Sequence, residues 1–152
     1  MDTDWRRIDI DALEEGNRLT AADLVPPAEP VSYEDVAVIN QQVKSLLAKG
    51  ENYDALAYSL SSPPYGGDDQ VKALHLSTVF DILKTTKTSS VAKLVGELST
   101  DEQDVLVKYL YKLMSLPQGQ QSSGVLLAWL DKVVEVAGNG PIIRYLNDRR
   151  TV

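Results

Sequence analysis

From residue 32 onward, apolar residues recur every three or four positions, in stretches separated by short breaks that contain glycine or proline. This period puts the apolar side chains on one face of an α-helix, whereas a half-buried strand would alternate at every second position. Because short breaks join only neighbouring helices that run in opposite directions, the helices must pack side by side. The sequence therefore predicts an all-α fold of about seven helices in a bundle or an α–α superhelix.

Capping residues and chain breaks set the expected helix ends. Ser32 has the character of an N-cap, and Gly50 that of a C-terminal stop. Ser99 and Glu102 have the spacing of a capping box, which predicts a helix start. Two segments are expected to lack helix: a polar turn over residues 85–90 and a loop over residues 117–121.

The most apolar segment is 125–130, in which all six residues are apolar. Val133, Val134, Val136 and Ala137 continue this character toward the next glycine. A helix that is apolar on most of its sides is typical of the middle of a core. We therefore expect this helix to be the central one.

Several polar or aromatic side chains lie within the expected helices. His75 has no acidic or serine side chain three or four positions away, so we expect a core or interface histidine rather than a catalytic one. Trp129 and Tyr109 occur at helical spacing among Leu and Val, and both are expected in the core. Asp104 and Lys108 are four residues apart, which predicts neighbouring charges on the outer face of one helix.

Charge is unevenly distributed along the chain. The formal net charge is −7, and residues 1–31 hold eight acidic residues against three arginines. The remaining residues are nearly balanced. Pro26, Pro27 and Pro30 oppose helix formation in the acidic part. The sequence thus predicts an extended acidic N-terminal tail over 1–31 and a helical domain over 32–152.

One patch of this tail carries apolar anchors. Trp5, Ile8 and Ile10 are separated by charged residues, and residues 8–11 alternate between isoleucine and aspartate. This alternation suits an extended peptide laid on another protein surface, with Arg6 and Arg7 as further contacts. The alternative is an ordinary solvated terminus with scattered apolar residues.

The composition leaves little material for chemistry. The chain has no Cys and one His, so disulfides, thiol nucleophiles and His- or Cys-rich metal sites are not expected. Its glycines form no phosphate-binding loop, and a pI of about 4.6 disfavours nucleic acids and anionic membranes. No signal peptide or membrane span is visible, which predicts a soluble protein of a reducing compartment. We expect no catalytic residue, no cofactor and no metal.

The apolar content of the body favours partner binding instead. A helical domain of this size with two broadly apolar helices is expected to leave apolar surface for partners. Tyr145, Arg149 and Arg150 near the C-terminus are candidate interface contacts, with a solvated helix end as the alternative. This pattern is typical of a subunit rather than of a free-standing enzyme.

Several ordered motifs carry a family resemblance. They lie at residues 104–112, 115–117, 123–129, 138–144 and 149–152, and the tail patch 5–11 precedes them. Together they resemble the subunit 5 family of the actin-related protein 2/3 complex, the assembly that nucleates branched actin filaments. Residues 43–64 fit the first helical hairpin of that family, with its glycine turn and its Pro-Pro stop.

The resemblance implies a set of expectations. The body would be an α–α superhelix docked on subunit 1, a β-propeller, and on subunit 4, and the assembled complex would bind actin filaments in the cortical cytoplasm. The tail would tether the actin-related protein 2 subunit through Trp5, Arg6, Arg7, Ile8 and Ile10. No nucleotide site is implied. Residues 12–31 contain Leu, Ala and Pro where a Gly- and acid-rich linker would be expected, so they are either a slack linker or docked.

Two other functions stay open at this point. Residues 49–56 resemble the turn into the second helix of a tetratricopeptide repeat, which would suit an adaptor that binds peptides in a helical groove. A small acid–base enzyme is the third hypothesis, although the adjacent acidic pairs in the sequence diverge on a helix and do not converge on a substrate.

Overall fold

The computed structural model describes residue 20 and residues 23–152, and within them the chain forms eight α-helices and no strand. The prediction of an all-α fold is therefore confirmed. The helices are α1 (Tyr33–Lys49), α2 (Asn52–Ser61), α3 (Asp69–Thr85), α4 (Thr88–Glu97), α5 (Thr100–Met114), α6 (Pro117–Gln120), α7 (Ser123–Ala137) and α8 (Gly140–Asn147). None of these helices is both long enough and apolar enough to cross a lipid bilayer.

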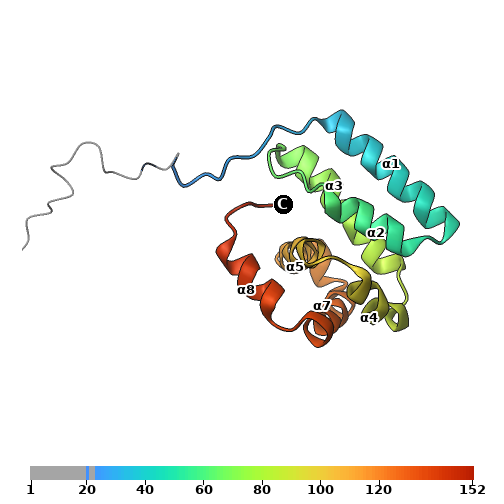
Figure 1. Ribbon diagram of the computed structural model, residues 1–152. Coiled ribbons are helices and arrows are strands. Elements are labelled where there is room, and N and C mark those ends of the chain that lie inside the picture. Colours follow the sequence, from blue (N-terminus) through green and yellow to red (C-terminus); the bar gives the residue numbers. More distant parts are fainter. Residues whose placement is uncertain (1–19, 21–22) are drawn as a thin grey trace, which may run out of the picture.

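The helices form two groups that meet at α5 (Figure 1). Helices α1, α2 and α3 pack against one another on one side. On the other side α4 packs along α7, while α7 and α8 both pack against α5. Helix α5 also contacts α2 and α3, so it lies between the two groups, which also meet directly where α3 packs on α7.

Local capping chemistry fixes several helix ends as the sequence predicts. The Ser32 hydroxyl accepts a hydrogen bond from the Asp35 amide at 3.2 Å and starts α1. Gly50, at φ 82°, ends α1, and the amide hydrogens of Gly50 and Glu51 reach back to Leu47 and Leu46. In α5 both halves of the predicted capping box between Ser99 and Glu102 are present.

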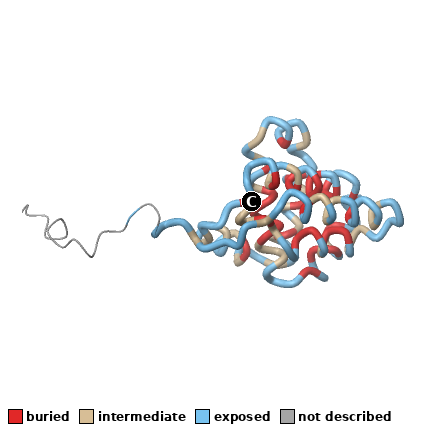
Figure 2. The backbone as a smooth tube through the Cα atoms, turned by 90° about the horizontal axis from the view of Figure 1, so that it is seen from above, coloured by how far each residue is buried: buried red, intermediate tan, exposed pale blue. Residues whose placement is uncertain are grey.

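The central helix is α5, and the expectation that residues 125–137 form it is wrong. Six consecutive residues of α5, from 105 to 110, are buried, while α7 buries only Leu126, Trp129 and Val133. Leu127 on α7 stays 57% exposed. The reason is that α5 has helices on several sides, whereas α7 keeps one face toward solvent; Figure 2 shows the buried residues gathered inside the body.

Two segments expected to lack helix are partly helical. Helix α3 ends at Thr85 and α4 already starts at Thr88, so only residues 86 and 87 of the predicted turn over 85–90 are non-helical. The predicted loop over 117–121 contains α6, which has a proline in its first turn. Gly119 of α6 lies so close to the end of α5 that an added Cβ would be 1.9 Å from the Leu113 carbonyl oxygen. This contact lets the chain fold back over α5.

Residues 23–31, which we call the strap, lead into α1 without forming a helix. At its outer end, the Asp23 amide donates a hydrogen bond to the Thr20 carbonyl at 3.0 Å. At the inner end, an added Cβ on Gly66 would lie 2.0 Å from the Glu29 carbonyl oxygen. The strap therefore touches the loop between α2 and α3, at a position where only glycine leaves enough room.

Candidate interaction surfaces near the carboxyl terminus

The last residues of the chain run back from α8 toward the loop between α2 and α3 (Figure 1). Val152 is only 5% exposed and belongs to the main hydrophobic cluster. Beside it, the Lys72 ammonium of α3 donates a hydrogen bond to the Thr151 hydroxyl at 3.1 Å. Residues 148–152, which we call the C-terminal segment, thus connect α8 with the first helical group.

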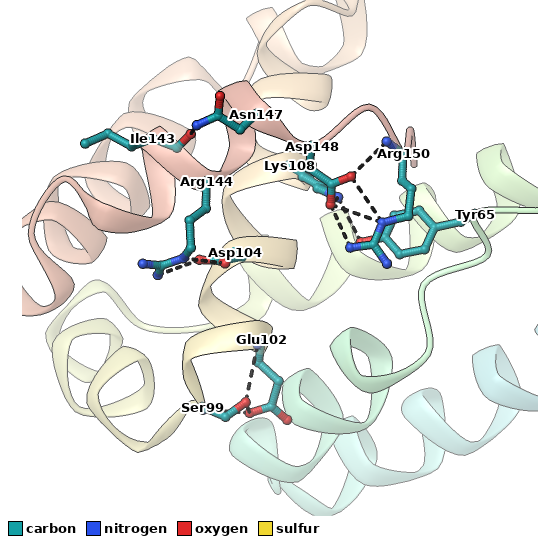
Figure 3. A network of polar contacts seen from close by, with 10 residues as sticks. All are labelled: Tyr65, Ser99, Glu102, Asp104, Lys108, Ile143, Arg144, Asn147, Asp148 and Arg150. Carbon is teal, nitrogen blue, oxygen red and sulfur yellow. Dashed lines mark hydrogen bonds and ion pairs between the residues drawn. The ribbon is translucent and has the colours of Figure 1, made fainter. Parts of the chain in front are cut away.

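A charged network holds the start of this segment (Figure 3). Lys108 of α5 is only 4% exposed, and its Nζ lies 2.5 Å from the Asp148 carboxylate and 3.0 Å from the Tyr65 hydroxyl. Arg150 donates to the same carboxylate at 2.8 Å and lies over the Tyr65 ring. Hydrogen bonds from Arg150 and Lys108 hold the pKa of Asp148 well below its ordinary value. Asp148 therefore stays ionised and joins α5, the α2–α3 loop and the C-terminal segment.

A second ion pair lies further out on the same two helices. The Arg144 guanidinium of α8 donates to both oxygens of Asp104 on α5, at 2.6 and 2.8 Å. The predicted pairing of Asp104 with Lys108 along the outer face of α5 is therefore wrong. Asp104 pairs with Arg144 and Lys108 with Asp148, each 40 positions later in the sequence, because α8 packs along α5.

Inside the core, a neutral polar pair joins α3 to α5. The Tyr109 hydroxyl lies 2.8 Å from His75 Nδ1, and both side chains are fully buried. Burial lowers the pKa of His75 to about 4 and raises that of Tyr109 above its ordinary range. Both groups are therefore neutral at pH 7. The prediction of a core histidine is confirmed, as are the buried positions of Tyr109 and Trp129.

Open hollows surround the C-terminal segment. One, of about 360 Å³, lies between α5 and the end of α8 and is lined by Tyr111, Tyr145 and Leu146 among others. Another, of about 650 Å³, lies between the strap and the C-terminal segment, and we call it the strap hollow. Its walls include Leu24 and Val25 on one side and Lys72, Arg149 and Arg150 on the other. In the part of the chain that the structure describes, no group of three His, Asp or Glu side chains could hold a metal ion.

Comparison with known proteins decides the family. The model of the ARP2/3 complex 16 kDa subunit, p16-Arc, matches residues 4–152. The chain belongs to the p16-Arc family. A relative from Saccharomyces cerevisiae, "Actin-related protein 2/3 complex subunit 5", is 45% identical over 154 residues, which cover 100% of both chains.

More distant p16-Arc relatives cover nearly the same span. "Actin-related protein 2/3 complex subunit 5-B" from Xenopus laevis is 32% identical and covers 97% of this chain and 94% of its own. "Actin-related protein 2/3 complex subunit 5-like protein" from Homo sapiens is also 32% identical, with the same shares covered. The resemblance read from the ordered sequence motifs is therefore confirmed.

The structure places the predicted contact residues of this p16-Arc chain in different surroundings. The tail residues lie outside the described part of the chain; they are Trp5, Arg6, Arg7, Ile8 and Ile10. Tyr145 is partly buried and stacks on Tyr111, with ring centroids 4.8 Å apart. Arg149 is exposed and lines the strap hollow. Arg150, which Asp148 holds, lines the strap hollow and also the hollow beside Tyr145. Tyr145 and Arg149 therefore do not share one hollow, and their role at an interface stays a prediction.

Sequence reasoning did not find the partners of Arg150. Asp148 and Lys108 are 40 positions apart, and Tyr65 lies a further 43 positions before Lys108. No local spacing marks such a cluster. The one available signal is an aromatic residue directly before two glycines, Gly66 and Gly67, which indicates a loop that another segment can approach closely.

Proposed function

We propose that this chain is a non-catalytic subunit of the actin-related protein 2/3 complex, where it supports nucleation of branched actin filaments. The observation that carries the proposal is the family match, which extends from residue 4 to residue 152. It thus includes both the tail patch and the helical body. The assembled complex would act in the cytoplasmic actin cytoskeleton.

The body is the part that docks on the rest of the complex. We expect subunit 1 and subunit 4 as its partners, by resemblance to the family. Support comes from apolar side chains that remain on the surface of the last two long helices: Leu127 at 57% exposed, Ile143 at 57% and Leu146 at 74%. Apolar side chains of this size are favourable contacts when a partner removes them from water.

The tail would tether the actin-related protein 2 subunit. Trp5, Ile8 and Ile10 would supply the apolar contacts, and Arg6 and Arg7 the charged ones. A second contact on a linked segment raises the effective concentration of its partner, often to about the millimolar range for short linkers. The tether would therefore keep that subunit close to its position while the complex rearranges.

Purification of the complex from cells that carry a tagged chain tests the proposal. The test variant combines Trp5→Ala, Ile8→Ala and Ile10→Ala, and the control combines Asp2→Asn and Asp4→Asn in the same tail. We expect the test variant to keep subunits 1 and 4 but to lose part of the actin-related protein 2 and to nucleate filaments more slowly. The control should behave as the wild type does.

Two outcomes would contradict this proposal. If the wild-type chain recovers no actin-related proteins, the chain is not a subunit of the complex. If the triple variant retains actin-related protein 2 and nucleates at the wild-type rate, the body alone makes the contribution and the tether is wrong.

A further inference from the structure

The strap hollow is lined by positively charged side chains, although the chain as a whole is acidic. Lys72, Arg149 and Arg150 line it, and no carboxylate of the described residues is among its lining side chains. The chain as a whole carries a net charge of −7. A concave site with three cations in an acidic protein attracts acidic groups, and its low-dielectric walls strengthen that attraction.

Two of the three cations, Lys72 and Arg150, are held in position by neighbouring side chains. The Lys72 ammonium is 3.1 Å from the Thr151 hydroxyl, which leaves further donors on the ammonium for another acceptor. Arg150 lies over the Tyr65 ring and shares Asp148 with the buried Lys108. Arg149 has no ion-pair partner among the described residues. Arg149 therefore presents to the hollow a positive charge that no described carboxylate pairs with.

The opposite wall of the hollow is apolar. Leu24 is 45% exposed and Val25 is 69% exposed, and two prolines follow them. The strap that carries them is fixed at its inner end by the close contact between Glu29 and Gly66. An occupant of this hollow would need acidic groups on one side and an apolar group on the other.

We propose that residues 11–15 of this chain's own tail dock in the strap hollow. This segment contains three acidic residues, Asp11, Glu14 and Glu15, and one large apolar residue, Leu13. Its three acids match the three cations of the hollow, and Leu13 suits the wall formed by Leu24 and Val25.

Chain connectivity favours this segment over a separate molecule. The strap begins at the hollow, and the eight residues between Glu15 and Leu24 can span about 30 Å when extended. That length allows the segment to reach the hollow from the strap. A segment joined by so short a connection also has a high effective concentration, so a weak individual contact is sufficient.

Docking would give the tail a second attachment point on the body. The part of the tail that carries the proposed anchors at Trp5, Ile8 and Ile10 would then leave the body at residue 11 instead of at the start of the helical domain. This consequence rests on the proposed tether, but the docking itself does not, because it takes place within one chain.

The test uses the isolated full-length chain, which contains no cysteine. Ala12→Cys gives one attachment point for a nitroxide, and amide signals are compared before and after the nitroxide is reduced. We expect strong loss of the signals of Gly67, Lys72 and Thr151, and recovery at about 1 M salt, where the Debye length falls to ~3 Å.

Matched variants separate charge recognition from chance proximity. Glu14→Gln with Glu15→Gln should restore the signals, whereas Asp2→Asn with Asp4→Asn, which removes the same charge, should not. Glu14→Lys with Glu15→Lys should also restore them. Adding Lys72→Glu and Arg149→Glu to the lysine variant should bring the loss back.

Several results would overturn the proposal. The first is unchanged signals in the nitroxide-labelled Ala12→Cys chain that has no other substitution, and the second is a signal loss that the glutamine variant leaves intact. A third is signal loss in a mixture of isotope-labelled chains and separate nitroxide-labelled chains, which would make a second copy the occupant. The tether can fail in the complex while this docking holds, or the reverse, so the two proposals are judged separately.

Discussion

Lys108 and Tyr109 are consecutive residues of α5, both are buried, and each bonds to a distant side chain. Lys108 belongs to a charged network at the end of the molecule, where Asp148 is still 23% exposed. Tyr109 belongs to a neutral pair with His75 in the middle of the core. Adjacent side chains on a helix point about 100° apart, so α5 can contribute one residue to the charged network and the next to the neutral pair.

The difference shows how depth decides which polar contact a protein can hold. Near the surface an ion pair keeps some contact with water, so two cations can share one carboxylate. In the centre, an ionised group would pay a desolvation cost of several kcal/mol, so the pair there is neutral and its pKa values move to keep it so. The charged network joins chain segments near the terminus, and the neutral pair joins two core helices.

The largest effect is expected from Asp148→Asn. This change leaves Lys108 buried without its counter-charge, and removal of one partner from such a pair costs about 3 kcal/mol of the free energy of unfolding. Denaturant unfolding at pH 7 measures the loss. Asp131→Asn, at an exposed position of α7, is the matched control and should change stability little. Equal losses in the two variants would show that the network does not hold the C-terminal segment.

The neutral pair should appear in the pH dependence of stability. The pKa of His75 is lowered to about 4 in the folded chain, so between that value and about 6.5 the unfolded chain binds the proton and the folded chain does not. Stability is therefore lost as the pH falls through this window, by about 1.4 kcal/mol between about pH 7.5 and pH 5.5. His75→Phe should lose stability at every pH, because the Tyr109 hydroxyl is then unpaired, but it should lack this slope.

Urea unfolding at several pH values measures both effects. The charged network gives a different window: the lowered pKa of Asp148 contributes stability that is lost only as the pH falls below about 4. Tyr109→Phe serves as the control for His75→Phe, since it breaks the hydrogen bond between residues 75 and 109 but keeps the titrating imidazole ring of His75. A slope that persists in His75→Phe would mean that other groups titrate in that range.

The smallest effect is expected from Arg144→Gln. Its pair with Asp104 has good geometry, but the arginine is exposed, and pairs in water contribute little because both ions are well solvated when separated. The change in the free energy of unfolding should be smaller than that of Asp148→Asn, and about 1 M salt should remove most of it. A loss as large as that of Asp148→Asn would show that exposure does not separate the two ion pairs.

Local rules were sufficient for much of the fold. The caps at Ser32, Gly50 and Ser99 involve residues within five positions, so the sequence alone could predict them. The packing of helices that are distant in the sequence could not be predicted from such local rules. The apolar period of α7 predicts an apolar helix but does not say how many helices surround it. Helix α5 contains several polar residues, so its sequence does not indicate that it is the central helix.

The candidate surfaces were predictable only in part. The family could be recognised from ordered motifs, whereas the tail anchors, which lie outside the described residues, stay a prediction. The partner of Lys108 could not be predicted, because the closest charge of opposite sign in sequence, Asp104, pairs with α8 instead. Contacts between segments 40 residues apart depend on how the helices cross, which periodicity does not specify.

The close approach at Gly119 has a consequence for sequence variation. Position 119 admits no Cβ without moving the backbone at Leu113, while position 124, five residues later, has no atom within 4 Å of an added Cβ. A library of variants of this chain would therefore be depleted of every substitution at 119 and tolerant of many at 124. Two glycines that look alike in the sequence thus differ sharply in the evolutionary freedom that the fold leaves them.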